Sequence, residues 1–140
     1  MGSSRSNKLY CSIRCLYVEG TPEEQVRQRL ISHMLGPLGY PRGLLAVEKN
    51  LFASGEDRRV DLVCFTPSKE SLKPLLLVEC KAGLLTKEAE NQLFGYNTKI
   101  GAPFLCLVNS AEIKMFWQEL GERKVLGFLP SYMQLIEKLC

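Results

Sequence analysis

The 140-residue sequence lacks the marks of several protein classes. No run of about 18 apolar residues is present, so no segment is long enough to span a membrane as a helix. The N-terminus also lacks the apolar core and small-residue site of a signal peptide, and we therefore expect a cytoplasmic protein. There is a single histidine, His33, and the close pair Cys11 and Cys15 has no two further ligands at the spacing of a zinc site. A structural zinc centre is not expected.

Charge and composition do not assign a function by themselves. The chain has 18 basic and 15 acidic residues, and the resulting net charge of +3 is too small to indicate a nucleic-acid partner. With 46% apolar residues the chain can bury the core of one globular domain, and no internal repeat or low-complexity linker divides it. We therefore predict a single domain over residues 1–140, in which the polar residues 1–8 form a disordered start.

Capping signals and hydrophobic periodicity predict an α/β chain. Thr21 and Pro22 begin a helix that Gly36 ends, and Thr86 caps a second helix. The predicted elements are helices at 21–36, 86–100 and 131–139 and strands at 44–51, 60–65, 75–82, 104–108 and 113–117, with a loop at 53–57, a polar turn at 66–74 and a short strand or irregular lead-in at 9–18. Three successive strands favour an antiparallel meander. The apolar run 104–108 follows a crossover helix and is typical of a strand in parallel pairing.

The strand at 75–82 is an apolar run that ends in a carboxylate and an ammonium group. Because side chains alternate along a strand, Glu79 and Lys81 are expected on one face and Cys80 on the other. Asp61 stands at the head of the neighbouring apolar run. Two carboxylates at adjacent strand ends are suitable ligands for Mg²⁺, with the backbone carbonyl of Cys80 as a further ligand. A lysine beside them can orient a water molecule or offset charge during phosphodiester hydrolysis.

A chance origin of this pattern has to be weighed against a catalytic one. Two charged residues two positions apart on an exposed strand are common, so Glu79 and Lys81 alone are a weak signal. The catalytic interpretation gains from four features that agree: the Asp61 strand, the apolar lead into Glu79, a Glu-bearing helix before the strands, and a helix directly after Lys81. Cysteine redox chemistry at Cys80 is disfavoured because its side chain should point into the core.

These motifs resemble a known family. Val60-Asp61 followed by Val78-Glu79-Cys80-Lys81, in an αβββαβ order, is similar to the PD-(D/E)xK nuclease superfamily. The chain resembles more narrowly the N-terminal endonuclease domain of type I restriction enzyme R subunits, and the resemblance extends over residues 20–118. Its further motifs are TPEEQVRQ from Thr21, Gly39-Tyr40-Pro41, Arg58-Arg59-Val60-Asp61, LLLVECKA from Leu75 and NQLFGYN from Asn91. The resemblance implies a restriction-endonuclease-like fold with a mixed central sheet flanked by helices.

The same resemblance implies roles for particular residues. Asp61 and Glu79 become Mg²⁺ ligands, with Mn²⁺ expected to substitute, and Lys81 becomes the catalytic lysine. The acidic position of the first helix falls on Glu23 or Glu24. Glu23 is preferred because it shares a face with Val26, Leu30 and Met34, whereas Glu24 fits a capping box.

A Gln-x-x-x-Tyr element of the family falls on Gln92 and Tyr96. These residues would hold DNA or support Lys81, although a simple packing pair one helical turn apart is the alternative. Four basic residues are further candidates for phosphate contacts: Arg58, Arg59, Lys87 and Lys99. For Arg58 and Arg59 the alternative is that they form the solvated entrance of a strand.

The chain departs from the family in two respects. Val60 stands in the position of the proline that gives the superfamily its name, and no Gly-x-x-x-x-Gly-Lys motif of an ATP-driven translocase is present. The chain is therefore expected to be either a stand-alone nuclease-like protein or a piece of something larger. A restriction role would require partners supplied elsewhere, such as translocase or specificity subunits on other chains. The predicted function is a Mg²⁺-dependent DNA endonuclease domain, and the alternative is a catalytically idle DNA-binding or assembly module that keeps the nuclease fold.

Overall fold

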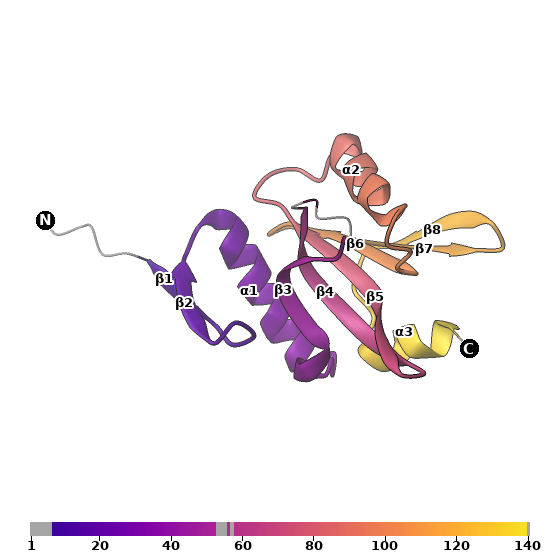
Figure 1. Ribbon diagram of the computed structural model, residues 1–140. Helices are drawn as coiled ribbons and strands as arrows, with labels where there is room; N and C mark the ends of the chain where they lie inside the picture. The colour runs from indigo at the N-terminus through magenta and orange to yellow at the C-terminus, as the bar shows by residue number, and fades with distance from the viewer. Residues whose placement is uncertain (1–6, 53–55, 57, 140) are drawn as a thin grey trace, which may run out of the picture.

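The computed structural model describes residues 7–52, 56 and 58–139, and Figure 1 shows their arrangement. Residues 1–6 of the predicted disordered start lie outside the described residues, as do residues 53–55 and 57 of the predicted loop. Within the described part of the chain, no helix has the length and apolar character needed to cross a membrane.

A mixed sheet of six strands forms the centre of the fold. Its order is β3-β4-β5-β6-β7-β8, and each neighbouring pair is antiparallel except β5 and β6, which are parallel. The predicted meander and the predicted parallel strand are both confirmed. The strands are β3 (Leu45–Asn50), β4 (Arg59–Ser68), β5 (Ser71–Cys80), β6 (Phe104–Val108), β7 (Ile113–Glu119) and β8 (Glu122–Leu126).

Helices cover both faces of this sheet (Figure 1). Helices α1 (Pro22–Leu35) and α3 (Tyr132–Leu139) contribute to the hydrophobic cluster on one face, and α2 (Lys87–Asn97) contributes to the cluster on the other. The predicted caps are present, because the hydroxyls of Thr21 and Thr86 accept hydrogen bonds from the backbone N–H groups of Glu24 and Ala89, each at 3.1 Å. A short 3₁₀ helix, η1 (Arg42–Leu44), leads into β3.

Two predictions about the strands were wrong. The predicted polar turn at 66–74 is the far end of the long β4–β5 hairpin, whose strands pair down to Ser68 and Ser71 around a two-residue turn. The prediction missed β8 altogether. This strand lies at the edge of the sheet and is half-exposed and charged. It follows a turn in which Leu120 and Gly121 both have positive φ. An Asn-Gly pair is the common sequence signal of such a turn, and this chain does not have it there.

The chain begins with a separate two-stranded hairpin beside α1, formed by β1 (Lys8–Cys11) and β2 (Leu16–Glu19) (Figure 1). Lys8 therefore belongs to a strand and not to the predicted disordered start. The hairpin joins α1 through Gly20, whose N–H donates to the carbonyl of Asn7 at 2.7 Å. A side chain at Gly20 would collide with that carbonyl, so the position requires glycine. Cys11 is fully buried against the core below α1.

Candidate functional site

The candidate site lies where the β4–β5 ladder ends. The last regular pair is Leu62 with Val78, and beyond it side chains replace the backbone ladder. The N–H of Cys80 donates to Oδ2 of Asp61 at 2.7 Å, and the N–H of Asp61 donates to Oε1 of Glu79 at 3.3 Å. Each strand thus receives a carboxylate from the other. This exchange brings Asp61 and Glu79 together, as the sequence predicted.

Glu79 and Lys81 line a cleft of about 330 Å³ between the end of the sheet and α2. The rest of its lining comes from the start of β4 and from α2; it consists of Arg58, Arg59, Ala89, Gln92, Leu93 and Tyr96. Cys80 points the other way into the core, and burial raises the pKa of its thiol. Four other clefts of about 340 to 660 Å³ lie elsewhere on the molecule, and none of them is lined by Asp61, Glu79 or Lys81.

The Glu79 carboxyl is affected by its surroundings. Burial, followed by the neighbouring charge of Asp61, raises the pKa of Glu79 to about 7, while Lys81 acts in the opposite direction. At neutral pH the Glu79 carboxyl is therefore close to the midpoint of its titration. A positive charge placed beside Glu79 would favour its ionised form.

This raised pKa predicts a pH dependence of stability in EDTA. An unfolded glutamate titrates near pH 4.3, so between about pH 4.5 and 7 the folded protein binds more protons at Glu79 than the unfolded chain does. The free energy of unfolding should consequently fall as pH rises through this window, by roughly 3 kcal/mol from this group. Urea unfolding of the wild type and of Glu79→Gln at pH 5 and pH 8 measures the effect. Equal pH slopes in the two proteins would contradict the assigned shift.

The acidic residues of α1 have different surroundings. Glu23 is exposed. The pKa of Glu79 is raised mainly by burial and by the charge of Asp61, and the charge of Glu23 makes a smaller contribution in the same direction. Glu24 is buried and is held by Arg14 at 2.7 Å, by Arg27 at 2.9 Å and by Gln28 at 2.8 Å. Glu23 thus lies within electrostatic reach of the site, whereas the carboxylate of Glu24 is used in an ion-pair network. The preference for Glu23 as the helix acid stays a prediction.

Arg27 is a residue of the site that the sequence reading missed. Its guanidinium donates to Oδ1 of Asp61 at 3.3 Å, and the residue is only 3% exposed. The sequence analysis quoted it only as part of the TPEEQVRQ motif and assigned it no role. The sequence signal for its burial was its position on the helix. Arg27 lies one turn before Ile31 and next to Val26, inside the stripe that α1 buries.

Gln92 and Tyr96 lie one turn apart on α2 in different environments. Gln92 is exposed and lines the cleft that contains Glu79 and Lys81. Tyr96 is 6% exposed, its hydroxyl donates to the backbone carbonyl of Arg58 at 3.4 Å, and its ring packs edge-on against Phe52. Tyr96 thus connects α2 to the start of β4, while Gln92 is open to a ligand.

This difference predicts opposite effects of two substitutions. Tyr96→Phe removes a buried, paired hydroxyl and should lower the free energy of unfolding by about 1 kcal/mol. Gln92→Ala should leave the melting temperature almost unchanged and reduce DNA cleavage. Thermal unfolding and a plasmid cleavage assay measure both quantities. A Gln92→Ala protein that melts several degrees lower and cleaves normally would assign Gln92 a purely structural role.

The four basic candidates lie on two elements. Arg58 and Arg59 line the cleft, and the Arg58 guanidinium lies 5.3 Å from the centre of the Tyr96 ring and 5.4 Å from that of Phe52. Lys87 begins α2 and pairs with Glu90 at 3.7 Å. Lys99 follows the end of α2 and pairs with Glu56 at 3.4 Å. These charges extend from the cleft along α2, and the two lysines do not line the cleft itself.

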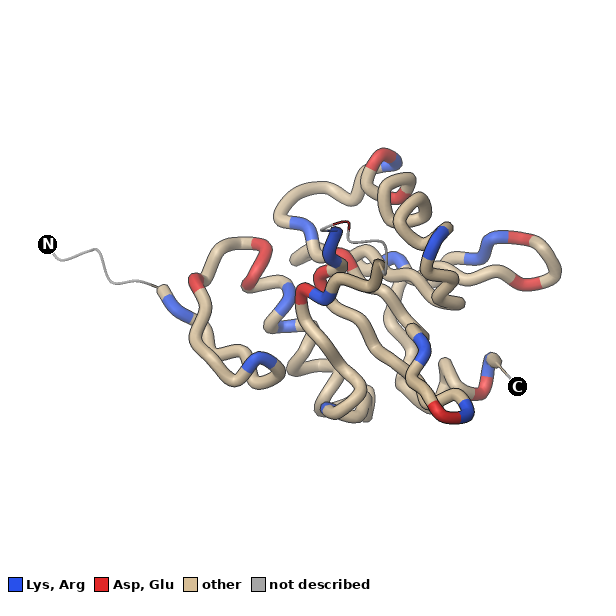
Figure 2. The backbone as a smooth tube through the Cα atoms, in the orientation of Figure 1, with Lys and Arg blue, Asp and Glu red and all other residues tan. Residues whose placement is uncertain are grey.

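The donor set fits a hard divalent cation of the kind that retains water. In the described part of the chain, no three His, Cys, Asp or Glu side chains form a group that could hold a metal ion by themselves. Mg²⁺ is commonly bound through one or two carboxylates together with water and substrate phosphate, and Asp61 and Glu79 supply that number. Figure 2 shows acidic and basic positions gathered where α1 meets the ends of β3 to β5.

The chain is similar to known proteins in sequence and in fold. Residues 22–130 match the family described as type I restriction enzyme R protein N terminus. The fold is similar to a solved fragment of "a putative HsdR subunit of a type I restriction enzyme" from Vibrio vulnificus YJ016, with 22% sequence identity and a TM-score of 0.57. That match covers 80% of this chain and 24% of the other. Among curated proteins, none matches the chain.

Proposed function

Because the chain belongs to the family of type I restriction enzyme R protein N termini, which its match over residues 22–130 establishes, we propose that it is a Mg²⁺-dependent DNA endonuclease domain. The reaction would be hydrolysis of a phosphodiester bond. The observation that carries the proposal is the meeting of Asp61 and Glu79 at the end of the β4–β5 ladder, where Glu79 and Lys81 line one cleft. The restriction-endonuclease-like fold supports it.

Each side chain has a role that follows from its chemistry. Asp61, Glu79 and the backbone carbonyl of Cys80 would hold the ion, which when bound supplies charge stabilisation and an activated water molecule. The Lys81 ammonium group would orient the attacking water or offset the negative charge that develops on the phosphate. The charge of Glu23 contributes to the raised pKa of Glu79. Glu23 would act on the bound ion through water in the outer part of the site.

The surroundings of the cleft are suited to a nucleic-acid backbone. Arg58 and Arg59 stand beside Glu79 and Lys81, and Gln92 offers an amide that can donate to a phosphate or a sugar oxygen. Lys87 and Lys99 at the two ends of α2 would extend the contact beyond the cleft. Contacts of this kind fix the position of DNA and carry no base sequence, so we propose binding without strong sequence preference.

The chain spans about a quarter of the length of the solved HsdR-type fragment that it resembles. A restriction function would therefore need activities that this domain does not supply. We propose that the domain works together with a translocase, which moves DNA, and with specificity subunits, which select the site. The domain itself would provide only the cleavage step.

The proposal is tested with the purified protein and four DNA substrates: supercoiled, linear, single-stranded and branched. Each is incubated with Mg²⁺, with Mn²⁺ or with EDTA. Cleavage of at least one substrate with either ion and none with EDTA is the expected result. Binding of DNA without cleavage under every condition would favour the alternative, a catalytically idle DNA-binding or assembly module.

A further inference from the structure

Arg27 is a buried cation between the N-terminal hairpin and the candidate site. Among the described residues, Glu24 and Arg27 are the two charged residues classed with the buried part of the molecule. Burying a charge is unfavourable unless partners compensate it, and the Nε atom of Arg27 has no hydrogen-bond partner in the described part of the chain. Such a residue is not explained by solubility or by helix propensity.

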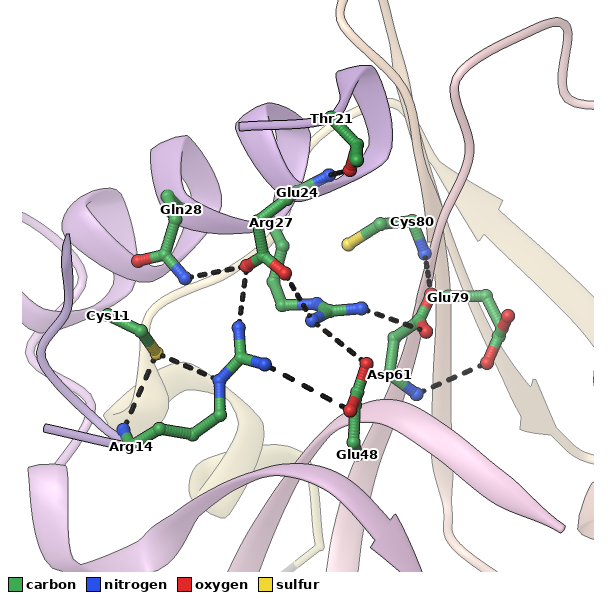
Figure 3. Close-up of polar contacts among 10 residues, drawn as sticks. All are labelled: Cys11, Arg14, Thr21, Glu24, Arg27, Gln28, Glu48, Asp61, Glu79 and Cys80. Carbon is green, nitrogen blue, oxygen red and sulfur yellow. Dashed lines mark hydrogen bonds and ion pairs between the residues drawn. The ribbon is translucent and has the colours of Figure 1, made fainter. Parts of the chain in front are cut away.

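The two ends of the Arg27 guanidinium contact different carboxylates. One terminal nitrogen donates to Glu24 at 2.9 Å and lies 3.5 Å from Glu48, while the other donates to Oδ1 of Asp61 at 3.3 Å (Figure 3). Glu48 stands across from Asp61 on β3, in a left-handed backbone conformation with φ of 53° that interrupts the ladder between the strands. The fixed fork of arginine can span these groups, whereas a lysine would offer a single point charge.

The far end of this network is fixed by the hairpin. Arg14 donates to Oε2 of Glu24 at 2.7 Å and reaches Cys11 through its Nε at 3.3 Å. Gln28 donates to the same oxygen of Glu24 at 2.8 Å. Glu24 is thus held from two sides, and it accepts in turn from the Arg27 side chain that reaches Asp61 (Figure 3).

The consequence for Asp61 is that both of its carboxylate oxygens have a defined direction. Oδ1 accepts from Arg27, and Oδ2 accepts from the N–H of Cys80 at 2.7 Å. Each oxygen retains a second lone pair. An oriented carboxylate with a free lone pair is what a metal ligand needs, and hydrogen-bond partners behind such ligands affect metal affinity strongly.

We propose that Arg27 is a positioning residue that orients the Asp61 carboxylate for a divalent cation, and that Glu24 and Arg14 hold Arg27 in place. This inference rests on the proposed function. It differs from a purely structural ion pair, which would contribute to folding and leave the cation affinity unchanged. Buried ion pairs add little to stability compared with apolar residues of the same volume, so stability alone gives a weak reason for the network.

The test uses Arg27→Lys, which keeps the positive charge and loses the fork. Mn²⁺ alone is the probe, and its binding is measured by electron paramagnetic resonance without DNA. We expect Arg27→Lys to weaken Mn²⁺ binding by about 10-fold, the lower end of the effect of such partners on metal affinity. Glu24→Gln, which alters the support of Arg27 and leaves all three proposed metal ligands in place, should act in the same direction by a smaller factor.

Tyr40→Phe provides the matched control. Its hydroxyl donates to the carbonyl of Pro130 at 2.7 Å in the core, so this variant loses stability without touching the network. It should bind Mn²⁺ as the wild type does. If Arg27→Lys fails to fold, Glu24→Gln decides the matter by itself.

The outcomes distinguish a failure of the positioning role from a failure of the proposed function. Wild-type Mn²⁺ binding with affinity unchanged, within about twofold, in the folded variants would overturn the positioning role alone. An equal loss of affinity in Tyr40→Phe would do the same, because general destabilisation would explain it. A wild-type protein that binds no Mn²⁺ would overturn the proposed function and the positioning role together.

Discussion

Asp61→Asn and Glu79→Gln are each expected to reduce metal-dependent DNA cleavage by about a thousandfold or more. Each substitution removes a charged ligand from a site whose proposed ion contributes several kcal/mol of transition-state stabilisation, and each 1.4 kcal/mol corresponds to a factor of ten in rate. The measurement is the initial rate of plasmid cleavage with Mg²⁺ and with Mn²⁺, together with the affinity for Mn²⁺ in the absence of DNA.

The amide substitutions are preferred to alanine because of what Asp61 contacts. Alanine at 61 would leave the buried Arg27 with one partner fewer and the N–H of Cys80 without its acceptor, so a loss of activity could come from unfolding. Asparagine keeps an oxygen for these donors. Glu70→Gln, an exposed change in the turn at the opposite end of the same hairpin, is the matched control and should retain full activity. Full cleavage by either site variant would refute the metal-ligand assignment.

The central elements of the fold could be predicted because local and periodic signals agree there. Thr21 and Thr86 stand before helices whose apolar residues recur at helical spacing, and both threonines cap them in the structure. The run from Phe104 to Val108 is buried at every position, as expected of a strand covered on both faces. In these segments the burial pattern is a direct consequence of the sequence.

The elements that prediction missed are those where burial is low. The far end of the β4–β5 hairpin is rich in polar residues and contains Pro67 and Pro74, which normally argue against a strand. There the strands are maintained by pairing with each other, around a turn in which Lys69 has a positive φ. Strand β8 is likewise an edge strand whose neighbour determines its conformation, and no apolar alternation marks it.

The meeting of Asp61 and Glu79 could be predicted from the sequence, whereas the residues that contact Asp61 from α1 could not. Asp61, Glu79 and Lys81 are recognisable because charged side chains interrupt apolar strands at defined positions. Arg27 and Glu24 are charged residues in a polar stretch of helix. The position of Arg27 in the buried stripe was a weak signal, and the tertiary fold shows that Arg27 turns inward to Asp61 and pairs with Glu24. For Tyr96, the contact with the carbonyl of Arg58, 38 residues away in the chain, has no counterpart in local sequence.

Lys81→Met should separate catalysis from metal binding. The substitution retains most of the length of the side chain and removes the ammonium group, which we propose acts on water or on the phosphate and not on the ion. Loss of one preorganised charge-stabilising group typically reduces kcat by about 10²–10³-fold, and we expect a loss of this size. Calorimetric titration should show Mn²⁺ affinity equal to or slightly higher than that of the wild type, because Lys81 places a positive charge near Glu79.

The control for this variant is Lys73→Met, an exposed lysine near the beginning of the same strand. It removes the same charge from the protein at a distance from the cleft and should leave both cleavage and Mn²⁺ affinity unchanged. If Lys81→Met instead loses Mn²⁺ binding outright while remaining folded, Lys81 supports the ligand arrangement itself. If it cleaves DNA at the wild-type rate, the ammonium group takes no part in the reaction, and the assignment of Lys81 as the catalytic lysine is wrong.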